Sequence, residues 1–113
     1  MEELRYYTCD VRLFNSKNYT TTIKLSDQTF KLDFRYNSFS ESYFLNVYDS
    51  SGYTIASNKE VAPDRVFVFQ PTSGVSLQFK FFKLLDSYDV NYENWIDNMA
   101  CVAFYSKWVN VEA

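Results

Sequence analysis

Acidic side chains gather between residues 85 and 98, and carboxylates are the groups in this chain best suited to chemistry. The cluster consists of Asp86, Asp89, Glu93 and Asp97. Paired carboxylates can hydrolyse glycosides, and clustered oxygens can bind calcium. The spacing fits no EF-hand loop, however, and carboxylates three or four residues apart in a polar loop usually only solvate it. We therefore interpret the cluster as a solvated loop, with an ion site or an interface contact as alternatives, and predict no cofactor and no metal.

Nucleophilic catalysis lacks its usual base in this chain. There are 0 histidines, which excludes Ser-His-Asp and Cys-His arrangements and histidine-based zinc sites. The hydroxyl rows at Thr20–Thr22 and Ser38–Ser42 therefore have no base to activate them. The sequence predicts a protein that is not an enzyme and has no small-molecule substrate.

The two cysteines, Cys9 and Cys101, lie far apart in sequence, each within an apparent strand. In a reducing compartment such residues are usually small buried hydrophobes with free thiols. The alternative is a disulfide bridge between the terminal strands.

A carbohydrate-binding module is the main alternative to a role in protein assembly. Aromatic rings beside amide groups can form a platform for sugars. The candidate residues here are Asn91, Tyr92, Asn94 and Trp95.

Size and charge exclude several other classes. The 113 residues predict a single domain over residues 1–113. The 11 basic and 14 acidic residues are scattered, so no basic stripe points to nucleic acid. No stretch approaches the roughly 18 consecutive apolar residues that a membrane span needs. The first ten residues lack the basic and apolar regions of a signal peptide, so we expect synthesis in a cytoplasm.

The elements that must position any site are strands. Phe30, Leu32 and Phe34 alternate with Lys31 and Asp33, which is the period of a strand with one buried face. The high aromatic content, 20% of the chain, also favours pleated surfaces over helices.

Similar β patterns recur along most of the chain, over residues 4–14, 19–26, 29–36, 43–48, 53–56, 66–70, 75–84 and 99–109. They predict an all-β fold, a small antiparallel β-barrel or two-sheet sandwich of about six to eight strands. The expected core residues are Ile23, Leu25, Phe30, Leu32, Phe34, Leu45, Val47, Val75, Leu77, Phe79, Val102 and Phe104.

Several strands are apolar on both faces, and such strands must be covered on both sides. A partner chain can provide the second cover, or a closed barrel or sandwich can bury these residues internally. The candidate interface residues are Phe67, Phe69, Tyr88, Tyr92, Trp95, Tyr105 and Trp108.

One order of segments resembles a known family. The alternating strand of residues 30–37, FKLDFRYN, is followed by an aromatic strand over Tyr43–Asp49 and then by Gly52-Tyr53-Thr54-Ile55. This order, within a similarity that covers residues 19–83, resembles the small plug proteins of contractile-tailed phage baseplates.

The resemblance implies structural work in the virion. A member of this family is expected to be a β-rich, non-enzymatic subunit at the tip of the tail tube. Its expected partners are other baseplate or tail-tube and hub proteins, and further copies of itself. Closed symmetric rings are the usual way in which such subunits bury surplus surface.

Overall fold

A computed structural model describes residues 1–72, 74–84 and 99–111, which form eight strands in two four-stranded sheets. The first sheet has the order β1 (Glu2–Val11), β8 (Met99–Asn110), β7 (Val75–Lys83) and β6 (Val66–Phe69). The second has the order β2 (Asn18–Leu25), β3 (Gln28–Asn37), β4 (Ser42–Tyr48) and β5 (Thr54–Glu60). All neighbouring strands are antiparallel, so the predicted all-β class and two-sheet sandwich are confirmed. None of the described residues forms a helix long and apolar enough to cross a membrane.

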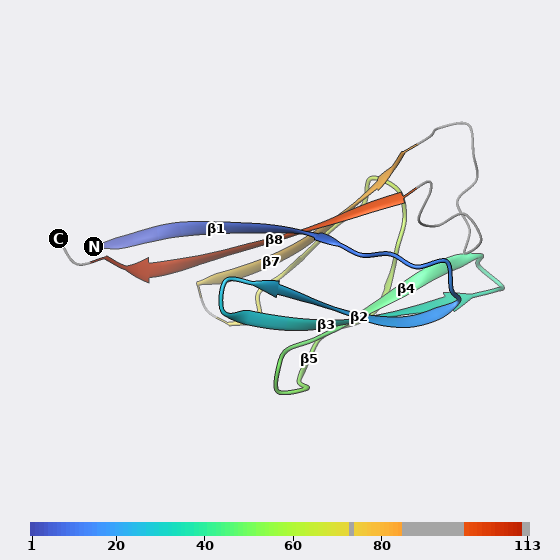
Figure 1. Cartoon of the computed structure of the whole chain (residues 1–113), viewed down its shortest axis with the longest axis horizontal. Coiled ribbons are helices and arrows are strands. Elements are labelled where there is room, and N and C mark those ends of the chain that lie inside the picture. The colour runs from blue at the N-terminus through green and yellow to red at the C-terminus, as the bar shows by residue number, and fades with distance from the viewer. Residues whose placement is uncertain (73, 85–98, 112–113) are drawn as a thin grey trace.

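The two sheets lie face to face as the layers of a flat, elongated molecule of 52 × 29 × 17 Å (Figure 1). The inward positions of β3, β4 and β7 form the centre of the core, as their two-residue alternation predicts. Aromatic rings join the layers: the ring centroids of Phe34 and Phe81 lie 6.4 Å apart, and those of Phe30 and Tyr105 lie 5.9 Å apart. The fully buried large side chains are Leu25, Leu32, Phe34, Leu45, Val47, Leu77, Phe79 and Phe81.

The predicted orientation of β8 is wrong. Val102 is half-buried and Phe104 exposed, whereas Cys101, Ala103 and Tyr105 face the core. Both alternations of this strand are apolar, so periodicity could not decide between them. Packing decides, because Ala103 lies opposite the buried Phe79 on β7, and a small residue beside a bulky ring fits between the sheets. Val75, also expected in the core, is only half-buried against it.

Polar side chains close the turns between strands of the second sheet. The Oδ1 atom of Asn37 accepts hydrogen bonds from the N–H groups of Phe39 and Ser40 after β3. After β4, the Oδ1 atom of Asp49 accepts from the N–H groups of Ser51 and Tyr53. Such Asx turns let a short polar segment reverse the chain.

β5 is longer than its apolar pattern predicts, because Ser57–Glu60 continue the strand as exposed polar residues. Its register with β4 shifts between Leu45 and Val47. At this bulge the Oδ1 atom of Asn46 accepts a 2.9 Å hydrogen bond from the N–H of Asn58. A side chain thus supplies the acceptor that an irregular ladder lacks.

The ends of β1 and β8 run past the rest of the sandwich as a two-stranded ribbon (Figure 1). β7 begins opposite Lys107, so among the described residues the pairs from Glu2–Asn110 to Leu4–Trp108 have no third strand beside them. Two strands alone are at best marginally stable in water. A further strand or surface beside this end of the molecule would therefore increase its stability.

Candidate docking face

The outer side of the β1-β8-β7-β6 sheet follows from its register, because directly opposed residues in antiparallel strands point to the same side. Phe104 lies opposite Thr8 on β1 and Gln78 on β7, and Gln78 lies opposite Val68 on β6. Since Phe104 points away from the core, the whole row does. Parallel rows complete what we call the apolar face: Glu2, Leu4, Tyr6, Thr8, Asp10, Val66, Val68, Ser76, Gln78, Lys80, Phe82, Ala100, Val102, Phe104, Ser106, Trp108 and Asn110.

Large apolar side chains on this face are open to solvent. The exposed fractions are 73% for Tyr6, 57% for Val68, 52% for Trp108, 44% for Val66 and 38% for Phe104. They come from three of the four strands of one sheet and therefore form a surface, whereas scattered exposed hydrophobes would carry no meaning.

The outer side of the second sheet has the opposite character. Asp33, Arg35 and Lys31 project from β3 between rows of hydroxyl and amide side chains on the neighbouring strands. We call this surface the polar face: Asn18, Thr20, Thr22, Lys24, Thr29, Lys31, Asp33, Arg35, Ser42, Phe44, Asn46, Tyr48, Thr54, Asn58 and Glu60.

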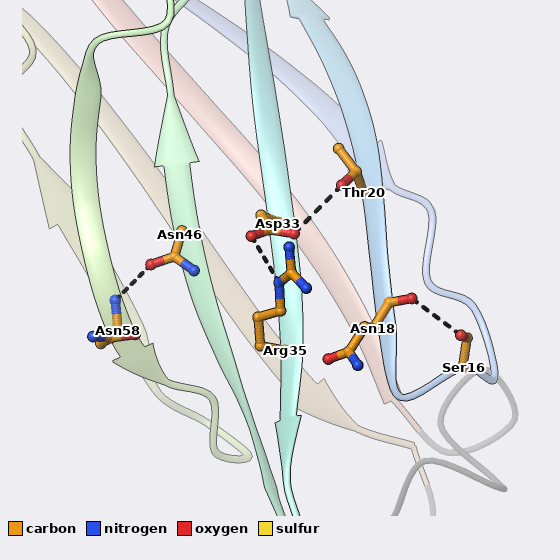
Figure 2. A network of polar contacts seen from close by, with 7 residues as sticks. All are labelled: Ser16, Asn18, Thr20, Asp33, Arg35, Asn46 and Asn58. Atoms are coloured by element: carbon orange, nitrogen blue, oxygen red, sulfur yellow. Dashed lines mark hydrogen bonds and ion pairs between the residues drawn. The ribbon is translucent and has the colours of Figure 1, made fainter.

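Hydrogen bonds satisfy the polar face from within (Figure 2). Asp33 is only 8% exposed, and its carboxylate accepts from the Nε of Arg35 at 3.0 Å and from the Oγ1 of Thr20 at 3.4 Å. No buried polar side-chain atom lacks a partner within the described ranges 1–72, 74–84 and 99–111. This face therefore needs no protein partner to complete its hydrogen bonds.

A cleft of about 730 Å³ opens between the two sheets. Asp27 of the β2–β3 turn and Lys107 of β8 both line it, and a 3.4 Å contact between the Nζ of Lys107 and the Oδ1 of Asp27 links the sheets there. A backbone hydrogen bond at Asp27, together with Lys107, lowers the pKa of this carboxyl below its ordinary 3.8. Burial raises the pKa of Tyr105, while the Ser26 hydroxyl and Lys107 lower that of Tyr7. We interpret this cluster as a structural clasp.

The cysteines lie close together but are not joined. Cys9 and Cys101 are both free thiols, half-buried and buried respectively. Burial raises the pKa of each thiol, so both are protonated at neutral pH and neither is an activated nucleophile. Within the part of the chain that the structure describes, no three His, Cys, Asp or Glu residues are grouped to hold a metal ion.

The residues predicted for the interface have different positions in the structure. Trp108 lies on the apolar face, over Gly74. Phe67 and Phe69 point toward the core and pack against it, and Tyr105 is 4% exposed inside the core. The remaining candidates lie outside the described residues, as do the acidic cluster and the proposed sugar platform: Tyr88, Tyr92 and Trp95, then Asp86, Asp89, Glu93 and Asp97, then Asn91 and Asn94.

Sequence reasoning missed three exposed members of the apolar face: Val66, Val68 and Phe104. Their strands were identified as apolar on both sides, but the side that faces the core was not. In β6, Val66 and Val68 alternate with the larger Phe67 and Phe69. This difference in size was the available signal for the side that faces the core, since bulky rings fill a core better than valines do.

A β-sandwich with one apolar and one hydrogen-bonded outer face is typical of subunits that act by packing against other proteins. The family model described as cyanophage baseplate Pam3 plug gp18 matches residues 6–105. The chain belongs to this family of baseplate plugs, and the resemblance seen in the sequence is confirmed. It is a structural protein of the phage tail, and its family implies interaction with other baseplate proteins. No curated protein and no solved structure matches the chain.

Proposed function

We propose that the chain is the plug at the tip of the tail tube and that it docks on the tube or hub and on neighbouring baseplate proteins through the apolar face. Its family supports the baseplate role. The exposed rings and valines on one side of the sandwich are the observation that supports docking by that side. Enzymatic activity is not part of the proposed role.

The composition of the apolar face suits an interface. Tyr6, Phe104 and Trp108 belong to the aromatic types that are enriched in interfaces, and tyrosine and tryptophan often dominate the binding energy. Gln78, Ser76 and Ser106 stand between them as uncharged hydrogen-bonding groups. The charged side chains are Asp10 and Lys80, with Glu2 at the end of β1. Interface centres are depleted in charge in the same way.

In the proposed plug, the outer side of the second sheet faces water. Its polar face satisfies its own groups through Asp33, Arg35 and Thr20, so it can face water without cost. One side of the plug then contacts the baseplate while the other is left toward solvent or the lumen of the tube.

The proposal is tested by making virions in which the two faces are altered separately. Phe104→Ser with Trp108→Ser changes the apolar face, and Phe44→Ser with Tyr48→Ser is the matched control on the polar face. We expect the first variant to be missing from purified tails and the control to be incorporated normally, as measured by mass spectrometry of the particles. Incorporation of the first variant and loss of the control would assign docking to the polar face instead. Circular dichroism of each purified variant verifies that it folds.

A further inference from the structure

β1 leaves a whole edge of its sheet without a neighbouring strand among the described residues. It is ten residues long, regular and without proline. The other edges offer less: β6 has four residues, β5 is interrupted by register shifts, and β2 has eight residues. A long, regular edge presents unpaired ladder groups to any further strand.

The groups that point outward from β1 follow from one hydrogen bond. The N–H of Val111 donates to the C=O of Met1 at 2.9 Å, so Met1 faces β8 with its backbone groups. In an antiparallel ladder the residues that bond to one neighbour alternate with those that point away from it. The outward N–H and C=O groups therefore belong to the even positions, which are Glu2, Leu4, Tyr6, Thr8 and Asp10.

We propose that two copies of this chain pair edge to edge along β1, antiparallel, with Tyr7 on the two-fold axis. In this register Thr8 of each copy forms a hydrogen-bonded pair with Tyr6 of the other. Glu2 of each copy then lies opposite Arg12 of the other, which is the first residue after β1, so a pair of opposite charges lies just beyond each end of the ladder.

The sequence of β1 selects this register. A shift that centres the pair on Tyr6 places Glu2 opposite Asp10, which sets like charges against each other. A shift in the other direction, centred on Thr8, places Arg12 opposite Leu4 and removes the contact with Glu2. One-residue shifts would oppose positions that point to different sides of the sheet. The register on Tyr7 is the one that both uses the edge from Glu2 to Arg12 and matches its charges.

Pairing in this way joins the β1-β8-β7-β6 sheet of one copy to the same sheet of the other copy, and the two form one continuous sheet. The two-fold axis is perpendicular to the sheet, so the apolar faces of the two copies lie on the same side of it. Tyr6 and Thr8 of the two copies meet at the seam, and each copy supplies half of a doubled docking surface. The edge pairing does not require the baseplate role, since it rests on the geometry and charges of β1 alone.

Proline substitutions test the pairing because they remove one outward N–H without removing an internal bond. Proline is tolerated on an edge strand where its nitrogen faces solvent. Thr8→Pro does this on β1. Thr22→Pro is the matched control on β2: Leu25 and Gln28 close a two-residue turn, so the even positions of β2 also point outward.

Sedimentation equilibrium of the full chain measures the result. We expect a monomer–dimer equilibrium that Thr8→Pro weakens by at least about tenfold, since two ladder bonds are lost in each dimer, and that Thr22→Pro leaves unchanged. A parent chain that stays monomeric at high concentration overturns the proposal. A dimer that tolerates Thr8→Pro, or that both prolines weaken equally, overturns it as well.

A charge exchange tests the register. Glu2→Arg and Arg12→Glu should each weaken the dimer by about threefold to tenfold, because each sets like charges together at both ends. The double variant restores opposite charges and should recover the parent affinity. If the double variant is weaker than either single variant, the register centred on Tyr7 is wrong. Normal incorporation of the Phe104→Ser and Trp108→Ser variant into tails, with an intact dimer, would contradict the docking proposal alone.

Discussion

The two outer faces of the sandwich are built on sheets of equal strand number, yet they differ in chemistry. On the polar face Asp33 is nearly buried among its own hydrogen-bond partners, whereas on the apolar face Phe104 and Trp108 are open to solvent. The polar face forms its hydrogen bonds within the chain as the protein folds. The apolar face instead leaves large rings open to solvent, and this difference is the basis of the proposal that the plug docks through that face.

The difference between the two faces depends on β3 presenting its apolar residues to the core. Leu32→Asp should have the largest effect on it, because this substitution places a charge on the inward side of β3. Leu32 is fully buried, so a carboxylate there has no partner and no water. We expect the variant to lose about 4 kcal/mol or more, enough to prevent folding of a small domain. The neighbouring Lys31→Asp, on the polar face, should fold. Far-UV circular dichroism distinguishes the two, and the reverse result would place the strand in the opposite orientation.

The next prediction sharpens the comparison of exposed surfaces. The folded chain should bind the dye ANS through the apolar face, and Tyr6→Ser with Phe104→Ser should remove most of that fluorescence. The polar-face pair Phe44→Ser with Tyr48→Ser should retain it. Because these side chains are exposed or half-buried, each variant should unfold within about 1 kcal/mol of the parent. Absence of ANS binding by the parent chain would mean that the apolar face is already covered.

A smaller effect is expected from Asp33→Leu on the polar face. The substitution removes the acceptor of Arg35 and Thr20, but Arg35 is largely exposed and can turn to water. We expect the protein to fold with a loss of about 1 kcal/mol, measured by urea denaturation. A loss as large as that of Leu32→Asp would show that this network holds the sheet together. Asp33→Asn, which keeps an acceptor, should fall between the parent and the leucine variant.

The smallest effect concerns the clasp between the sheets. The folded-state pKa of Asp27 is depressed, so its contribution to stability is present above the unfolded value of 3.8 and is lost as the pH falls through the lower folded value. Thermal melts should therefore show a slightly steeper loss of stability below about pH 4 in the parent than in Asp27→Asn. Identical acid profiles would mean that the contact with Lys107 does not stabilise the fold.

The alternation of apolar residues predicted most of the fold correctly. In β2, β3, β4 and β7 one alternation is apolar and the other polar or mixed, so hydrophobic burial leaves a single orientation for each strand. In β8 the alternation was ambiguous, and Phe104 was expected inside. β5 was too short in the prediction because Asn58 and its neighbours are polar and pair through a bulge, which no periodicity reveals.

The candidate site was less predictable than the fold. Of the residues predicted for an interface, Trp108 is exposed on the apolar face, whereas Phe67 and Phe69 pack against the core. The sequence showed that certain strands carry apolar residues on both sides. It did not show which side is inside, because that depends on the volume available between the sheets.

By itself, then, the sequence determined the strand content, the inward residues of the amphipathic strands, the absence of a histidine-based catalytic site and the family. These depend on composition and on local periodicity, because the spacing of apolar residues decides which side of a strand is buried. Only the tertiary structure decided the register of β1, β8 and β7, the side of β8 that faces solvent, and therefore the gathering of Tyr6, Val68, Phe104 and Trp108 on one surface. That surface arises from residues distant in the chain, and their meeting is fixed by how two sheets pack and which residues fit between them.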